Sequence, residues 1–234
     1  MPRASGTSNG AVDYSGAVPS SERHTRSMAD MRAFRDAVTG WAAGGPGGPA
    51  RDLAGQLGVR AAVLLEGPSD LAAVEALAAR RGRDLDAEGV CVVPMGGAMS
   101  VGRYADLLGP PGLGLRLVGL CDENEKRFYD RALQRVRDPA PHPHVFVCRR
   151  DLEDELIRAL GAAGVEEIIQ AENDLRAWQT FLHQPAQLGR PRQQQLRRFL
   201  GTKKGRKIRY GRLLVEALGP EQVPAPLDDL LARL

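Results

Sequence analysis

The stretch "RAAVLLEGPSDLAAVEALA", residues 60–78, decides the fold of this protein. It begins with an uninterrupted apolar run, which is typical of a strand buried on both faces of a sheet. A Glu-Gly-Pro turn follows, and the apolar residues then recur with the period of a helix. The stretch therefore predicts a β-strand that leads directly into an α-helix, with Glu66 and Asp70 at the junction.

The same alternation of strand and helix continues through residues 58–162. Each further apolar run is followed by a segment with helical periodicity, and Gly or Pro separates the units. Alternation of this kind predicts an α/β, Rossmann-like fold with a parallel four-stranded sheet flanked by helices. The four strands are expected at 60–65, 89–95, 115–121 and 144–148.

The segments on either side of this block have a different character. Residues 1–27 are rich in Ser, Gly, Ala and charge without any period, so we expect a disordered tail. Residues 28–57 are expected to hold a helix up to Trp41 and then a Gly/Pro linker that starts in "GGPGGPA". Residues 163–234 contain only helical patterns and predict a basic, helical C-terminal annex.

The composition is that of an ordinary globular protein. Hydrophobic residues make up 43% of the chain and charged residues 26%. No apolar stretch is long enough for a membrane helix and no secretory signal is visible, so a cytoplasmic location is expected. The three cysteines lie in apolar runs without Cys-x-x-Cys spacing, and we interpret them as reduced core residues.

Charge is distributed unevenly along the chain. Residues 175–215 contain eleven Lys and Arg and no acid, which leaves 21 basic against 29 acidic residues elsewhere. Such a segment predicts a surface for a polyanion, although a solvated helix face is the simpler alternative. The expected phosphate contacts are Arg190, Arg192, Arg197, Arg198, Lys203, Lys204, Arg206 and Arg209.

Acidic residues follow three of the four predicted strands. The carboxyl ends of parallel strands meet at one edge of a sheet, so these side chains are expected to converge there. Oxygen ligands of this kind suit Mg²⁺ or Mn²⁺. Each acid taken alone could instead cap a helix or favour its N-terminus. The candidate metal ligands are Glu66, Asp70, Asp122, Asn124, Asp151 and Glu153.

Four segments together resemble the Toprim domain, and in particular the branch found in the overcoming lysogenization defect (OLD) nucleases. The first strand and its Glu-Gly turn carry the resemblance, with support from the three segments after the later strands. The resemblance spans about residues 60–220 and implies a metal-dependent nuclease in which Lys207 assists cleavage. The segments are "VLLEGPSDLAAVEALA", "VVPMGGAMSVGRYADLL", "GLCDENE" and "RDLEDELIRAL".

Two features depart from the family pattern. Family members often carry Asp-x-Asp after the third strand, whereas this chain has Asn124 in place of the second Asp. Glu123 and Glu125 are the acids that could replace the missing negative charge. Larger members also have an ATPase, but this chain contains no G-x-x-x-x-G-K-[ST] loop. An ATPase would therefore be a separate partner, and an oligomer is compatible with the resemblance.

These observations lead to one main hypothesis and two alternatives. The main hypothesis is cleavage of DNA phosphodiester bonds with two divalent ions about 4 Å apart, with Glu66 and Lys207 as catalytic residues. Glu66, Asp70 and Asp122 would hold one ion, and Asp151 and Glu153 the second. The alternatives are a Toprim enzyme that cleaves RNA or transfers a nucleotidyl group, and a non-catalytic module that binds nucleic acid or a partner.

Overall fold

The computed structural model describes residues 20–110, 112–136 and 145–234, and its centre is a four-stranded sheet. All strand pairs are parallel and the spatial order is β2-β1-β3-β4. The predicted parallel α/β fold is therefore confirmed. Of the disordered tail predicted at 1–27, residues 1–19 lie outside the described residues, and residues 20–27 are instead the first part of helix α1 (Ser20–Ala42). The strands are β1 (Ala61–Leu65), β2 (Val90–Pro94), β3 (Arg116–Asp122) and β4 (Val145–Cys148).

Strand β1 is central and is buried on both faces. Its residues alternate between two cores: Ala61, Val63 and Leu65 face one, and Ala62 and Leu64 face the other. This is why the strand reads as a continuous apolar run rather than as an alternating pattern.

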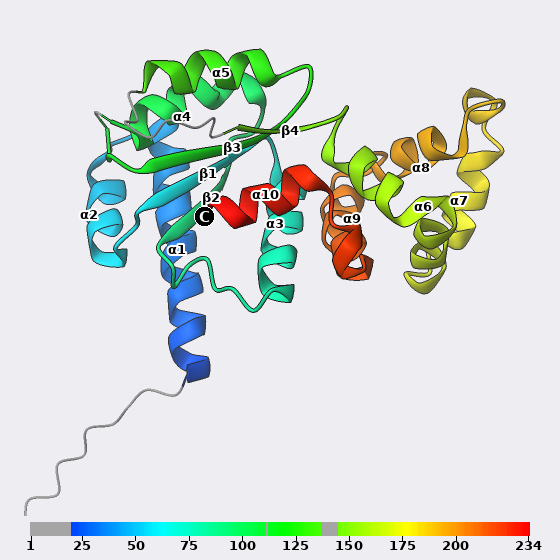
Figure 1. Cartoon of the computed structure of the whole chain (residues 1–234), viewed down its shortest axis with the longest axis horizontal. Helices are drawn as coiled ribbons and strands as arrows, with labels where there is room; N and C mark the ends of the chain where they lie inside the picture. Colours follow the sequence, from blue (N-terminus) through cyan, green and yellow to red (C-terminus); the bar gives the residue numbers. More distant parts are fainter. Residues whose placement is uncertain (1–19, 111, 137–144) are drawn as a thin grey trace, which may run out of the picture.

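One face of the sheet is covered by the N-terminal helices together with α4 and α5 (Figure 1). Helix α1 buries Met31, Phe34 and Val38 in this core. The predicted linker is in part a helix, because a Gly-Pro pair in "GGPGGPA" occupies the first turn of α2, where Pro fits without losing a hydrogen bond. The helices are α1 (Ser20–Ala42), α2 (Gly48–Leu57), α4 (Val101–Leu108) and α5 (Lys126–Arg135).

The other face is covered by α3 (Pro68–Arg80) and by α10 (Ala225–Arg233), which returns from the C-terminal region to the sheet (Figure 1). Leu227, Leu230 and Leu231 of α10 belong to the same core cluster as Val118 and Leu120 of β3. The C-terminal helices are thus not a separate annex, because they share one hydrophobic core with the sheet.

Helices α6 to α9 complete the C-terminal region on one side of the sheet (Figure 1). Helix α6 crosses the predicted boundary at residue 162, with a kink at Gly161. Trp178, Phe181 and Phe199 pack together, with ring centroids 5.1–5.9 Å apart. The helices are α6 (Leu152–Ala171), α7 (Leu175–Leu182), α8 (Arg192–Leu200) and α9 (Lys204–Ala217), and 3₁₀ turns occupy Ala98–Ser100, Pro185–Gln187 and Pro220–Gln222.

Close packing of α9 against α3 fixes the position of the basic helix. A Cβ atom added to Gly211 would lie 2.6 Å from the carbonyl oxygen of Ser69, so only glycine allows this approach. At the other end of α3, the Arg80 guanidinium donates hydrogen bonds to the carbonyl oxygens of Val215 and Leu218 at 2.5 and 2.6 Å. Lys207 of α9 is thereby held near the N-terminus of α3.

Among the described residues, no helix is both long enough and apolar enough to cross a membrane.

Candidate metal centre

Glu66 is held at the end of β1 by the loop that follows β2. The backbone N–H groups of Gly96 and Gly97 both donate to the carbonyl oxygen of Glu66 at 3.0 Å. The two glycines have φ values of 75° and 128°, a region that residues with a side chain rarely adopt. The Gly-Gly pair therefore fixes the backbone from which the Glu66 side chain projects.

Asp122 and Glu125 come from one tight turn after β3. The N–H of Glu125 donates to the carbonyl oxygen of Asp122 at 2.9 Å, and the N–H of Glu123 donates to the carbonyl oxygen of Cys148 at 3.0 Å. The turn brings the side chain of Glu125, which directly precedes α5, back toward the strand end.

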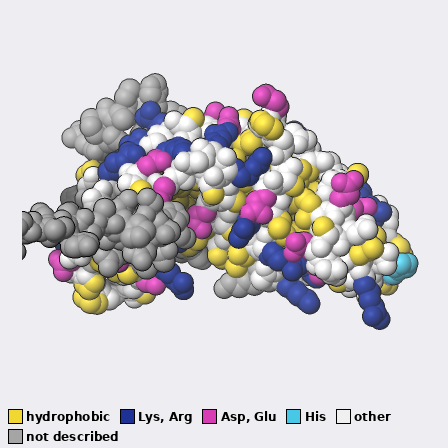
Figure 2. Space-filling view, turned by 90° about the horizontal axis from the view of Figure 1, so that it is seen from below, with side chains coloured by type: hydrophobic (Ala, Val, Ile, Leu, Met, Phe, Trp, Pro, Cys, Tyr) yellow, Lys and Arg dark blue, Asp and Glu magenta, His cyan; other side chains and the backbone are white. Residues whose placement is uncertain are grey.

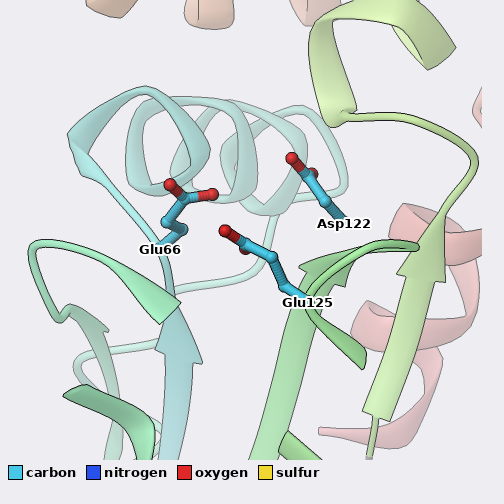
Figure 3. Close-up of side chains that lie close together, drawn as sticks. All are labelled: Glu66, Asp122 and Glu125. Carbon is cyan, nitrogen blue, oxygen red and sulfur yellow. The ribbon is translucent and has the colours of Figure 1, made fainter. Parts of the chain in front are cut away.

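These three carboxylates face one another (Figure 3). One oxygen from each of Glu66, Asp122 and Glu125 can be chosen so that all three lie within 4.8 Å of one another. Burial, and then the charges of Asp151 and Glu66, raise the pKa of Asp122 to about 8. Burial and the adjacent Glu66 carboxylate raise the pKa of Glu125 to about 7. Without a cation, these neighbouring carboxyl groups therefore resist ionising together.

A divalent cation fits this cluster. Within the parts of the chain that the structure describes, none of its three carboxylates has an ion-pair partner, and Oε2 of Glu125 is buried without a hydrogen-bond partner. A buried acceptor of this kind is costly unless a ligand satisfies it. Carboxylate oxygens alone suit a hard ion such as Mg²⁺ or Mn²⁺.

A second acidic group lies beside the first, but it is already paired with basic side chains. Asp151 caps α6 by accepting the N–H of Asp154 at 2.8 Å, and it forms an ion pair with Arg197. Glu153 is buried and lies 3.1 Å from the Nζ of Lys207. Burial opposes the charge of Lys207, but the carboxylates around it, Glu153 foremost, raise its pKa.

Asp70 lies between the two groups and has a structural partner. Its Oδ2 accepts the N–H of Gly67 at 3.0 Å and so closes the first turn of α3. Burial and the nearby Glu153 carboxylate raise the pKa of Asp70 to about 7. The predicted trio of Glu66, Asp70 and Asp122 stays a prediction: Glu125 is the acid that lies with Glu66 and Asp122, while one oxygen of Asp70 is engaged in the helix cap.

The remaining predicted ligands fall in two places. Asn124 is exposed at the tip of the turn after β3, and Glu125 rather than Asn124 joins Glu66 and Asp122. Asp151 and Glu153 lie outside the three-carboxylate cluster, and Lys207 lies beside them. The sequence signal for Glu125 was an acid three residues after the strand-terminal Asp122, in a turn short enough to fold back.

The predicted phosphate-binding residues differ in how far their charges are neutralised. The Arg206 side chain is only 8% exposed, stacks on Phe199 and pairs with Asp174 at 3.3 Å, so its charge is engaged within the fold. Arg192 pairs with Glu166, and Arg209 pairs with Glu172 and Asp174. Arg190, Arg198 and Lys203 are exposed, and the Lys204 side chain lies outside the described part.

One face of the molecule illustrates this pairing. Figure 2 shows dark-blue basic side chains interspersed with magenta acidic ones rather than a continuous basic surface. Six of the eleven basic residues in 175–215 form ion pairs with acids outside that segment: Arg192, Arg197, Arg206, Lys207, Arg209 and Arg212.

Comparisons with known proteins agree with this geometry. Residues 59–123 match the family described as overcoming lysogenization defect protein-like, TOPRIM domain. Among curated proteins, none is significantly similar to this chain.

Two solved structures have a similar fold. The C-terminal region of the Xanthomonas campestris pv. campestris OLD protein, phased with platinum, is 26% identical with a TM-score of 0.56, covering 74% of this chain and 90% of that one. The C-terminal region of the Burkholderia pseudomallei OLD protein is 22% identical with a TM-score of 0.53, covering 75% of this chain and 96% of that one. The latter likeness concerns the fold alone.

The matched segment contains β1, α3, β2 and β3, and it ends just after Asp122. It includes two of the three clustered acids, and the third follows within three residues. We conclude that the chain carries an OLD-like Toprim domain with an acidic, metal-binding type of cluster at its sheet edge.

Proposed function

We propose that the protein is a metal-dependent nuclease that hydrolyses phosphodiester bonds of DNA. The observation that carries the proposal is the cluster of Glu66, Asp122 and Glu125, with an unpartnered buried oxygen and with Lys207 beside it. An OLD-like Toprim domain around this cluster supports a substrate that is a nucleic acid.

Glu66, Asp122 and Glu125 would hold one Mg²⁺ or Mn²⁺ ion. A bound ion supplies positive charge for the phosphoryl oxygens and makes a water molecule more acidic. The residues contribute by keeping three carboxylates close together before the ion arrives. The Gly96–Gly97 loop and the turn after β3 fix the backbone for that purpose.

Lys207 would stabilise the negative charge that develops on the phosphate. A compact ammonium group can approach a phosphoryl oxygen directly, and charge stabilisation of this type is a large contribution in phosphoryl chemistry. Its raised pKa keeps it protonated at neutral pH. Glu153 would orient it through their 3.1 Å contact.

A second ion would require a rearrangement. Asp151 and Glu153 are engaged with Arg197 and Lys207, so these cations would have to move away if a second ion were bound between Asp70, Asp151 and Glu153. We therefore propose one ion at the Glu66 cluster as the resident site, and a second ion as one recruited together with the substrate phosphate.

Exposed basic residues would hold the rest of the nucleic acid. Arg190, Arg198 and Lys203 are exposed, and within the described residues no acid is paired with them. Contacts with phosphates would provide affinity without reading the sequence.

The direct test is nicking or linearisation of a supercoiled plasmid in the presence of Mg²⁺ or Mn²⁺. We expect cleavage by the unaltered protein, no cleavage in EDTA, and loss of cleavage by Glu66→Gln. Cleavage that persists in Glu66→Gln would remove the assignment of the centre.

Labelled RNA and nucleoside triphosphates, assayed in parallel, separate the alternatives. Preferential RNA cleavage or nucleotidyl transfer would favour the other Toprim reactions. Binding of nucleic acid without turnover of any substrate would favour the non-catalytic module.

A further inference from the structure

A cleft beside Lys207 shares part of its wall with the residues proposed above for the chemistry, and the rest of its wall has no role in it. Its volume is about 570 Å³, and it lies between the first turn of α6, the 3₁₀ turn Pro185–Gln187, α8 and the start of α9. Lys207 forms part of its wall and also acts electrostatically on Glu125. Asp151 on the same wall lies three residues after Cys148, the β4 residue that is paired with Asp122, so the cleft adjoins the metal centre and a ligand inside it would be near a phosphate held there.

The charges of the cleft favour an anionic ligand. Two carboxylates on its wall, Asp151 and Glu153, are paired with Arg197 and Lys207, which also line the cleft. Arg198 lines it too, is exposed, and has no ion-pair partner within the described residues. This guanidinium is free to bind a phosphate group in bidentate fashion.

The cleft also contains an unsatisfied amide. Gln187 is 2% exposed, and its Oε1 is buried without a hydrogen-bond partner among the described residues. Leaving such an acceptor unpaired is costly, and a turn of the side chain toward the cleft would let an N–H group of a ligand satisfy it. Gln184 lies at the start of the same 3₁₀ turn and offers a second amide, while the Phe181 ring supplies an apolar wall.

We propose that this cleft binds one unpaired nucleotide of the strand whose phosphate lies at the metal centre. The inference rests on the proposed function. Bases carry N–H donors on their edges, which match the Oε1 of Gln187, and the adjoining phosphate matches Arg198. The volume suits one small ligand, within the range of about 300–1,000 Å³ for such sites.

A double helix cannot enter a cleft of this size, so the bound nucleotide must be out of the base stack. The substrate class that follows is DNA with at least one unpaired nucleotide next to the scissile phosphate: a single strand, a flap or a gap. Continuous duplex would be cut more slowly, because unpairing a base costs free energy.

The first experiment measures nucleotide binding in EDTA, so that its readout does not depend on cleavage. The four deoxynucleoside 5′-monophosphates and the base-free 2-deoxyribose 5-phosphate are titrated by ligand-observed NMR. We expect the nucleotides to bind at least about tenfold more tightly than the base-free compound, as expected for a hydrogen bond plus apolar contact with the base.

Variants assign the contacts. Gln187→Leu should weaken nucleotide binding by about threefold to tenfold and leave the base-free compound unaffected, because one hydrogen bond is lost. Arg198→Ala should weaken the binding of both the nucleotides and the base-free compound, because both carry the phosphate. Gln193→Ala is the matched control, since Gln193 lies on the same helix as Arg198 but outside the cleft, where it donates to Asp154. If Gln187→Leu does not fold, Gln184→Ala provides the same comparison at an exposed position.

Equal binding of nucleotides and the base-free compound would overturn the proposal, as would unchanged nucleotide binding in folded Gln187→Leu and Gln184→Ala. Cleavage assays keep this failure separate from failure of the proposed function. Selective nucleotide binding by a protein that cuts nothing would sink the nuclease and leave the cleft as assigned. Cleavage without selective nucleotide binding would overturn the assignment of the cleft and leave the proposed nuclease in place.

Discussion

The edge of the sheet and the basic C-terminal helices present charge in opposite ways. At the sheet edge, Glu66, Asp122 and Glu125 bring like charges together, and within the described residues no cation is paired with them. In the C-terminal helices, Arg192, Arg197, Arg206, Lys207, Arg209 and Arg212 all form ion pairs with acids. The acidic cluster needs a ligand for its charge, whereas much of the basic charge already serves the fold.

The difference shows that clustering in space and clustering in sequence carry different information. Acids from separate strands meet only because a parallel sheet brings strand ends together, so their proximity is a property of the fold. Basic residues that are neighbours in sequence have different fates: Arg197 pairs with Asp151, whereas Arg198 has no ion-pair partner among the described residues. A count of charges overestimates the binding surface, whereas a count of strand ends locates the site.

The largest effect is expected from Glu125→Gln, compared with Glu123→Gln in the same turn. Glu125 belongs to the cluster, while Glu123 is exposed. We expect Glu125→Gln to lower the cleavage rate on the order of 10²–10³-fold, because the ion loses a charged ligand, and Glu123→Gln to change it little. Plasmid cleavage together with Mn²⁺ calorimetry measures this. Equal losses of cleavage rate in the two variants would show that membership of the cluster does not distinguish Glu125 from Glu123.

Lys207→Met should lower the cleavage rate by about 10²-fold, because a charge-stabilising group is removed. It should also destabilise the fold, because the buried Glu153 loses its ion-pair partner. The measurement is single-turnover cleavage at saturating Mn²⁺, with circular dichroism as the check on folding. A rate close to that of the unaltered protein would assign Lys207 to the paired, structural class instead.

Arg206→Gln tests the structural side of the comparison. The guanidinium of Arg206 is buried between Asp174 and the ring of Phe199, so its loss should destabilise the fold by about 3 kcal/mol. Urea unfolding provides the value. Arg198→Gln, at an exposed position without a partner in the described part, is the control and should stay within about 0.5 kcal/mol.

The stability of the metal-free protein should fall as pH rises from about 5 to about 8. The pKa of Asp122 is raised to about 8 and that of Glu125 to about 7 in the folded state, so folding retains protons that the unfolded chain releases near its ordinary carboxyl pKa. The contribution of these protons to the free energy of unfolding is fully present below the ordinary carboxyl pKa. It is lost as the pH rises through the pKa values of the folded protein, about 7 and about 8.

Chemical unfolding in EDTA at pH 5 and pH 8 measures the slope, and Mn²⁺ should remove the loss at the higher pH. The prediction would be contradicted if the metal-free protein were equally stable at pH 5 and pH 8, both as the unaltered chain and as Asp122→Asn.

The smallest effect is expected from Arg198→Ala on binding of nucleic acid by the inactive Glu66→Gln protein. Removing one phosphate contact should reduce the slope of log affinity against log salt by about 0.7–0.9. Arg192→Ala, whose cation is paired with Glu166, should reduce it less. Fluorescence anisotropy over a salt series measures both. A larger change for Arg192 would show that its ion pair opens to bind nucleic acid.

The sequence was sufficient for the sheet and for two of the three clustered acids. Continuous apolar runs announced the strands, and Glu66 and Asp122 directly follow or end them. It did not show that Glu125 would lie with Glu66 and Asp122, because the backbone turn that brings Glu125 back toward the strand end depends on single hydrogen bonds.

The ion pairs of Arg192, Arg206 and Arg209 could not be predicted from the sequence for a similar reason. Their partners Glu166, Glu172 and Asp174 directly precede the acid-free segment, and packing of the helices is needed to bring them together. The linker expected before β1 was in part a helix, since Gly48 and Pro49 start α2 rather than interrupt a chain.

The position of Lys207 depends on the absence of a side chain at Gly211. One helical turn separates the two residues, and the missing side chain of Gly211 is what lets α9 touch the backbone of Ser69. A single methyl group there would push the helix outward and carry the ammonium group with it. The reach of a charged side chain toward its phosphate is thus set by an uncharged contact one turn further along the same helix.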